Sequence, residues 1–279
     1  MSKDNLTPSY PFASLSLHKS DSIRFLQFPE EIYTEAQSVI LKVWPPGIQT
    51  SGPYGESYQY KLKKRPFGSM GDQEAVGGAR LVRNMITFLS SRSWDLVTPL
   101  LCSRHLGAKD TLIFRKRSPE TPPPPPVEWL TVSMLRSDRL RIIYDASSEI
   151  DADHGHLGLL IASLKKMLEE MDYFQKGDWS FDSFEFKLKG LPWPAHGVNT
   201  VKTRMLMLRV LDVLDSFGWE SRVNIGQRSG TDDYRMPDCW YFVRPRTGRR
   251  SGATTTATVA NLLPSRSYSD EANKTLDLL

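Results

Sequence analysis

The chain has 279 residues, of which 39% are hydrophobic and 24% charged, a composition typical of soluble globular proteins. It holds no apolar run long enough to span a membrane and no secretory signal at its start, and the net charge of +4 permits nucleic-acid binding without arguing for it. Without a secretory signal, we expect an intracellular protein, cytoplasmic or nuclear. Only Cys102 and Cys239 are present, too few for a disulfide scaffold or a cysteine-based zinc site.

The first predicted elements are two short strands, over residues 12–18 and 23–28, which alternate apolar and polar residues around a turn. A helix follows, because Pro29-Glu30-Glu31 suits a helix N-terminus and apolar residues recur at helical spacing as far as Pro45. Strict alternation predicts a third strand over 58–62. A second helix around Leu81–Leu89 and two further strands give the order ββαβαββ.

The same elements recur in the second half of the chain. The block SYQYKLKKRPF, from Ser57, aligns with SFEFKLKGLPW, from Ser183, with five identities in eleven positions. Three further blocks repeat in the same order, at separations of 117 residues for Arg24 and Arg141, 125 for Trp94 and Trp219, and 128 for the strand from Thr111 and its counterpart. We interpret this pattern as a duplication.

The duplication predicts an α+β protein made of two tandem ββαβαββ repeats, with antiparallel-rich sheets and helices packed on one face. The sequence divides into a disordered N-terminus, a first repeat, a proline-rich linker, a second repeat and a disordered tail, over residues 1–11, 12–117, 118–128, 129–246 and 247–279.

Five consecutive prolines, Pro122 to Pro126, occupy the linker. Such a run holds neither helix nor sheet and favours a polyproline II spacer. The alternative is a ligand for SH3 or WW modules. We favour the spacer, because the run falls where the two repeats must be joined.

The densest polar cluster contains Asp151, Asp153, His154 and His156. These side chains are suitable metal ligands, but zinc sites normally draw ligands from separated elements, and no second cluster completes this one. We favour an acidic cap on the following helix. The aligned segment of the first repeat, Pro29-Glu30-Glu31, has the acids without the histidines, which supports the cap.

The sequence predicts no catalytic residue and no cofactor. The five histidines stand in no nucleophile motif, and His105, three residues after Cys102, is a poor candidate for a dyad. No Walker A loop and no Gly-x-Gly-x-x-Gly fingerprint occur. Trp94 and Trp219 at the helix ends are interpreted as core, and Asp110 and Asp238 as turn caps.

Basic residues on the repeated third strands are candidates for contacts with a protein partner or with nucleic acid. No aromatic RNA-binding motif accompanies them, and lysines on the wet face of a strand often serve only solubility. The candidate residues are Lys61, Lys63, Lys64, Arg65, Lys187 and Lys189.

Four blocks, FKLKGLPW, SFGW, SDRLRII and KDTLIFRK, resemble a group of filamentous-fungal proteins built from this repeated unit. The resemblance implies a fungal, intracellular origin and no known activity. The first repeat departs from the pattern at Lys64, Phe67 and Ser93.

These observations favour a non-enzymatic interaction protein that binds an unidentified protein partner through a sheet face or the cleft between the repeats. The alternatives are a nucleic-acid-binding protein that uses the basic strands, and an enzyme of unknown type.

Overall fold

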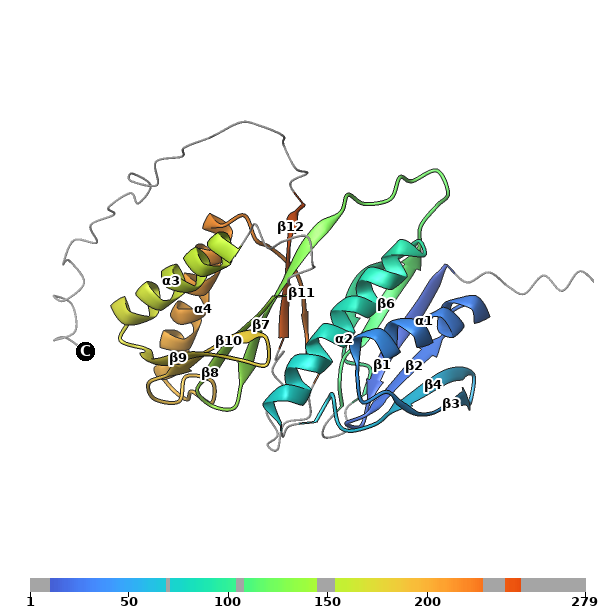
Figure 1. Cartoon of the computed structure of the whole chain (residues 1–279), viewed down its shortest axis with the longest axis horizontal. Helices are drawn as coiled ribbons and strands as arrows, with labels where there is room; N and C mark the ends of the chain where they lie inside the picture. Colours follow the sequence, from blue (N-terminus) through green and yellow to red (C-terminus); the bar gives the residue numbers. More distant parts are fainter. Residues whose placement is uncertain (1–10, 69–70, 104–107, 145–153, 228–238, 247–279) are drawn as a thin grey trace, which may run out of the picture. The chain divides into compact units, whose positions relative to one another are not determined.

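The computed structural model describes residues 11–68, 71–103, 108–144, 154–227 and 239–246. They form two six-stranded antiparallel sheets, each with two helices, so the predicted α+β fold with a duplicated unit is confirmed. Figure 1 shows one repeat in blue to teal and the other in green to red. Each repeat has its own sheet.

Repeat 1 contains sheet A, with strand order β3-β4-β2-β1-β6-β5. Its elements, in chain order, are β1 (Phe12–His18), β2 (Ser22–Leu26), α1 (Glu30–Val43), β3 (Ile48–Tyr54), β4 (Ser57–Leu62), α2 (Asp72–Ser91), β5 (Trp94–Leu100) and β6 (Thr111–Lys116).

Repeat 2 contains sheet B, with strand order β11-β12-β7-β8-β10-β9, which is the same arrangement. Its elements are β7 (Val127–Leu135), β8 (Arg139–Tyr144), α3 (His154–Glu170), β9 (Phe174–Ser180), β10 (Ser183–Leu188), α4 (Asn199–Ser216), β11 (Glu220–Ile225) and β12 (Cys239–Pro245).

The sequence prediction missed one strand in each repeat, so the true order is ββαββαββ. The missed strands, β3 and β9, lie at the edges of their sheets. β3 contains Gly52 and Pro53, and β9 contains Gly177. Glycine and proline are typical of turns, but an edge strand tolerates them because one of its sides has no ladder to maintain.

Burial alternates along β1 of sheet A as predicted, whereas consecutive residues of β7 and β8 in sheet B are buried on both faces. In β1, Leu15 and Leu17 are buried while Ser14 and Ser16 point to the other face. Trp94 and Trp219 are 2% and 4% exposed, so their assignment to the core is confirmed. Large aromatic side chains at these positions fill the layer between helix and sheet.

Helix α2 is buried on two sides. Leu81, Met85 and Leu89 pack within repeat 1. The same cluster also includes side chains from the opposite face of sheet B, which turns away from α3 and α4: Ile143, Val223, Ile225, Cys239 and Tyr241. Sheet B therefore covers α2 on one face and carries its own helices on the other.

Further contacts join the repeats. Asp110 and Gly226 exchange two hydrogen bonds, from Gly226 N to the Asp110 carboxylate at 2.6 Å and from Asp110 N to the Gly226 carbonyl at 2.9 Å. Asp110 thus bonds to the other repeat, which the cap prediction did not foresee, while Asp238 lies outside the described residues. Both repeats belong to one compact unit that ends at Arg246.

The segment between β6 and β7 is exposed from residue 118 to residue 126. The spacer and ligand interpretations of its prolines both remain predictions. Among the described helices, none has the length and apolar character needed to cross a membrane.

Candidate protein-interaction surface

A stripe of exposed apolar side chains runs along α4. Val201, Met205 and Leu208 recur at intervals of three and four residues, and Val198 precedes them at the helix start. Their exposed fractions are 79% for Val198, 59% for Val201, 53% for Met205 and 56% for Leu208. Helical geometry places such residues on one face. We call these four residues the α4 stripe.

The stripe lies away from the core of repeat 2. Leu206, Val210 and Leu214 are the fully buried residues of α4, and they pack into the cluster formed with sheet B. Consequently α4 has apolar side chains on two faces, of which only one is covered. A contiguous apolar surface of this kind marks interaction sites in soluble proteins.

The equivalent helix of repeat 1 shows what a covered face looks like. Ten residues of α2 are buried, against three of α4. Val76, Arg80 and Arg83 occupy the positions of Val201, Met205 and Leu208, and in α2 they are 1% exposed, half-buried and 6% exposed, respectively.

Polar contacts attach α2 to sheet B. The Tyr241 hydroxyl lies 3.2 Å from the Ala79 carbonyl oxygen and 2.6 Å from the Gln227 side-chain oxygen, and the Arg80 guanidinium donates to the carbonyl of Asp182, in the turn between β9 and β10, at 2.7 Å. Burial lowers the pKa of Arg83 to about 10. The contacts of Ala79 and Arg80 with repeat 2 therefore fix the position of α2 along sheet B.

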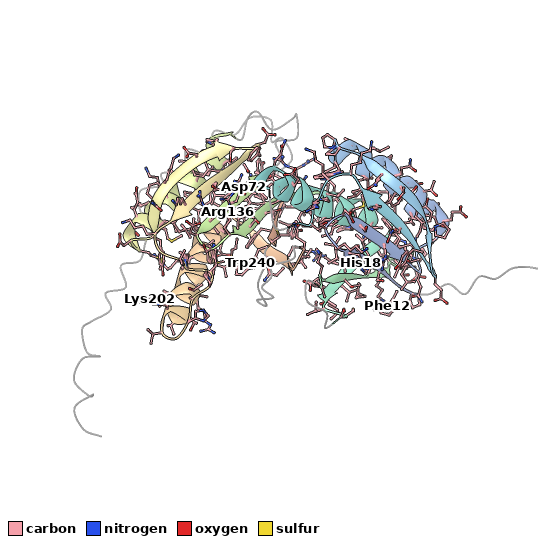
Figure 2. All side chains as sticks on the ribbon, turned by 90° about the horizontal axis from the view of Figure 1, so that it is seen from below. Phe12, His18, Asp72, Arg136, Lys202 and Trp240 are labelled. Carbon is pink, nitrogen blue, oxygen red and sulfur yellow. The ribbon has the colours of Figure 1, made fainter. Side chains whose placement is uncertain are left out.

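Charged residues surround the N-terminus of α2. Asp72 lies 3.1 Å from a guanidinium nitrogen of Arg136 and 3.6 Å from one of Arg141; Figure 2 shows Asp72 and Arg136 beside each other. Arg141 is 1% exposed and also pairs with Glu185. Because a buried guanidinium requires several acceptors, this cluster positions one repeat on the other.

The outer face of sheet A, opposite its helices, carries basic and aromatic side chains. The Arg24 guanidinium lies 3.7 Å from the centroid of the Tyr54 ring, and that of Arg115 lies 5.6 Å from the Phe12 ring. His18 shares this face, where burial, followed by the charges of Arg24 and Lys109, lowers its pKa to about 4. His18 is therefore neutral at physiological pH.

The six predicted basic residues lie in two separate groups. Lys61 is half-buried on the outer face of sheet A, and Lys63, Lys64 and Arg65 are exposed just beyond the end of β4. Lys64 lies 3.7 Å from Glu74.

The second group belongs to sheet B. Lys187 is half-buried opposite Arg139, and Lys189 is exposed and paired with Asp172. The duplicated lysines thus meet different surroundings in the two repeats.

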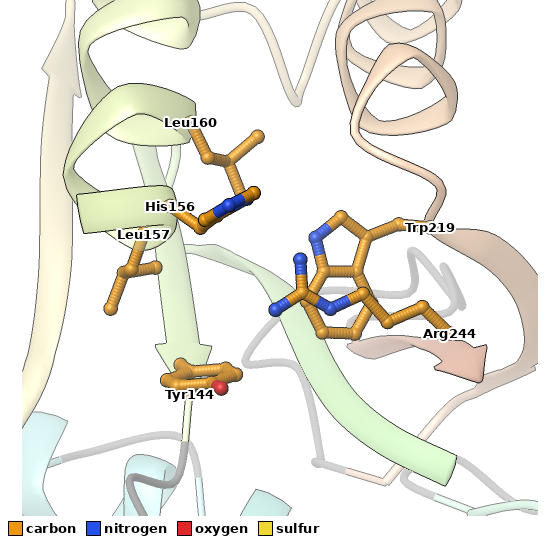
Figure 3. A pocket seen from close by; sticks show the side chains of 6 residues that line it. All are labelled: Tyr144, His156, Leu157, Leu160, Trp219 and Arg244. Atoms are coloured by element: carbon orange, nitrogen blue, oxygen red, sulfur yellow. The ribbon is translucent and has the colours of Figure 1, made fainter. Parts of the chain in front are cut away.

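A small recess lies between α3 and the end of β12, with about 200 Å³ of empty space, open solvent included. Figure 3 shows that the Arg244 guanidinium lies over the Trp219 ring, 4.6 Å from its centroid. Small-molecule sites usually enclose about 300–1,000 Å³. This recess is too small to hold a metabolite; its lining residues are Tyr144, His156, Leu157, Leu160, Trp219 and Arg244.

Most of the candidate metal ligands lie outside the described residues. Asp151, Asp153 and the side chain of His154 lie outside the described residues, and His156 is an exposed member of the recess lining. Within the described ranges, no group of three or more histidine, cysteine or acidic residues could hold a metal ion. The favoured helix cap and the alternative metal site are both untested by the described residues.

Sequence reasoning missed the α4 stripe, although the sequence carries its signal. The apolar positions of α4 that predicted the helix were those facing its own core. Val201, Met205 and Leu208 form a second set at helical spacing, and a helix that is apolar on more than one face is normally buried on more than one face.

Comparison with known proteins places the repeats in a family. A model of a domain whose description names no activity matches residues 11–115 and again residues 128–243. The chain belongs to this domain family. The two matches correspond to the two repeats, so the family domain is the α+β unit, present twice.

No curated protein matches the chain. Among solved structures, the chain is similar to a conserved kinetoplastid-specific protein from Trypanosoma cruzi, at 16% identity and a TM-score of 0.29. That match covers 38% of this chain and 98% of the other.

Proposed function

We propose that the protein is a non-enzymatic interaction protein that docks a protein partner on the α4 stripe. The observation that carries the proposal is the contrast between the two equivalent helices. The face of α2 around Val76 and Arg83 is covered by a sheet, whereas Val201 and Leu208 at the same positions of α4 are exposed. Covering them with a protein surface would remove a contiguous apolar area from water.

The flanks of the stripe limit what can bind there. Lys202, Arg204 and Arg209 are exposed beside it, followed by Asp212 toward the helix end. An interface with an apolar centre and a charged rim is typical of protein complexes. The proposal therefore specifies a folded protein surface with apolar side chains at its centre.

The proposal includes an intracellular site of action, in the cytoplasm or nucleus, and the fungal origin that the sequence resemblance implies. Neither Cys102 nor Cys239 forms a disulfide in the part of the chain that the structure describes, and Cys239 is buried with its thiol 3.4 Å from the Ser133 hydroxyl. Cysteines outside disulfides are typical of reducing compartments, which supports this part of the proposal.

Site-specific photo-cross-linking in cells tests the docking face. A photo-reactive residue at position 205 should give a discrete adduct with one protein identifiable by mass spectrometry, and Leu208→Asp should abolish the adduct. The matched control is position 41 on α1, because Leu41 is an exposed leucine, 50% exposed, outside the stripe. Equal labelling at positions 205 and 41 would overturn the proposal.

Nucleic-acid binding is the second candidate. It is favoured by the concentration of Lys61, Lys63, Lys64 and Arg65 at one end of β4. If phosphates bind there, Lys61→Glu with Lys63→Glu should abolish salt-dependent retention on heparin and DNA columns. The equivalent pair of changes at Lys187 and Lys189 is the control, since Lys189 is already paired with an acid. Absence of retention by the wild-type protein at low salt would exclude this candidate.

A further inference from the structure

The partner of the α4 stripe can be specified further, on the basis of the proposed function. We propose that the stripe docks on the outer face of sheet A in a second copy of this chain, so that copies associate head to tail. An interface of the same kind already exists within one molecule. There, the face of sheet B that turns away from α3 and α4, its outer face, covers α2. The outer face of sheet A lacks a helix like the one that sheet B covers, and the α4 stripe lacks a sheet like the one that covers α2.

The contacts of α2 define how a helix lies on this kind of sheet. Arg141, in the same row across the sheet as Cys239, approaches Asp72 at the start of α2. Tyr241, one row further along β12, bonds to Ala79. One row along the sheet therefore corresponds to about two turns along the helix, from its N-terminus toward its C-terminus.

The outer face of sheet A presents corresponding side chains in the same rows. Arg24 replaces Arg141, and the five apolar residues of sheet B that cover α2 have three apolar counterparts. Leu26 and Leu100 are 37% and 48% exposed, and Ile113 is half-buried. The full set of equivalents to Ile143, Val223, Ile225, Cys239 and Tyr241 is Leu26, Thr98, Leu100, Thr111 and Ile113.

The internal interface and the proposed one differ most in the sizes of one pair of facing side chains, and in each pair the sizes are complementary. In the internal interface, Tyr241 lies against the small residue Ala79, which is fully buried. In the proposed interface, the sheet residue is the smaller Ile113 and the helix residue is the longer Arg204, whose aliphatic stem would lie on Ile113 while its guanidinium stays at the charged rim. A large residue thus faces a small one in both cases, with the roles exchanged, as close packing requires.

Charge is complementary at the far end of the helix. One row beyond Ile113 lies Arg115, at the position of Val243. The row order established for α2 brings this residue toward the C-terminal half of α4, which carries Asp212 and Asp215. An exposed arginine and two carboxylates at the rim would fix the orientation of the helix on the sheet.

This interface joins two different faces of the same chain, so each copy has one of each to offer. Such a heterologous contact propagates from copy to copy, unlike a symmetric pairing of two α4 helices, which stops at a dimer.

The experiment uses the purified full chain and three aspartate variants. Leu208→Asp changes the helix face, Leu100→Asp changes the sheet face, and Leu41→Asp is the control for adding a charge at an exposed leucine. Sedimentation velocity and light scattering measure mass against concentration, after circular dichroism has shown that each variant is folded.

We expect the wild type and the control to grow beyond a dimer as concentration rises. Either face variant alone should weaken self-association roughly 30-fold or more, as loss of a central interface residue does. An equimolar mixture of the two face variants should form a pair and stop there, because only one intact helix face and one intact sheet face can meet.

Two results would overturn the inference. A wild type that stays monomeric would exclude self-association, and the cross-linking at position 205 would then have to find a different protein for the proposed function to stand. A dimer that Leu208→Asp disrupts and Leu100→Asp leaves intact would show symmetric pairing of α4 instead of docking on sheet A.

Discussion

Replacing Gly78 by alanine should destabilise the protein by about 3 kcal/mol, a typical cost of overpacking a site that cannot yield. Gly78 lies in α2, where an added Cβ would be 2.2 Å from the carbonyl oxygen of Pro66. The opposing atom belongs to the backbone, and α2 is also covered by sheet B. A shift of α2 away from Pro66 would therefore disturb its packing against sheet B.

Urea unfolding followed by far-UV circular dichroism measures this loss. The control is Gly158→Ala in α3, where nothing lies within 4 Å of an added Cβ. That change should stabilise the protein by about 0.8 kcal/mol through helix propensity alone. If Gly78→Ala were as stable as the wild type, α2 could not be held as closely as the structure shows.

The Arg141→Met variant should lose about 3 kcal/mol of stability, since truncating one member of a buried ion cluster leaves its partners uncompensated. The Arg141 guanidinium bonds to Glu185 and to the hydroxyls of Ser180 and Ser183, and it approaches Asp72 of the other repeat. Methionine fills similar space without a charge. Arg139 and Arg136 keep part of the charge balance, which limits the loss.

Arg24→Met supplies the matched control, because Arg24 occupies the same position in repeat 1 on the open face of sheet A. Its side chain donates to Gln59 at 2.8 Å and lies over Tyr54, without a covering layer from the described part of the same chain. We expect its removal to cost less than about 1 kcal/mol, as for exposed charged groups. Equal losses for the two variants in urea unfolding would contradict the distinct surroundings described for the two arginines.

Much of each repeat could be predicted from local patterns. Alternation identified β1 and β4, helical spacing identified α1, and two aligned copies supported each assignment. The edge strands β3 and β9 escaped, because residues such as Gly52 and Pro53 are typical of turns and give no alternating signal. Pairing with a neighbouring strand makes β3 a strand, and that pairing is not local in sequence.

The candidate site was less accessible to sequence reasoning. The basic residues stood out in the repeated block, yet Lys61 and Lys187 meet different neighbours once folded. The sequence shows the α4 stripe as a second set of apolar positions at helical spacing. Whether another element covers these positions depends on how the two repeats pack. The same positions in α2, Val76 and Arg83, are buried.

By itself the sequence determined the duplication, the α+β class, most strands and helices, and the core role of Trp94 and Trp219, because these follow from short-range periodicity and from side-chain size. Only the tertiary structure decided that each repeat keeps its own sheet and that sheet B covers α2 while α4 stays open. Equivalent residues in a repeated sequence receive the same local geometry, but burial depends on what lies on the far side of each element. With two repeats in one chain, the sheet of the second repeat covers a helix of the first, but the helices of the second repeat have no third sheet to cover them.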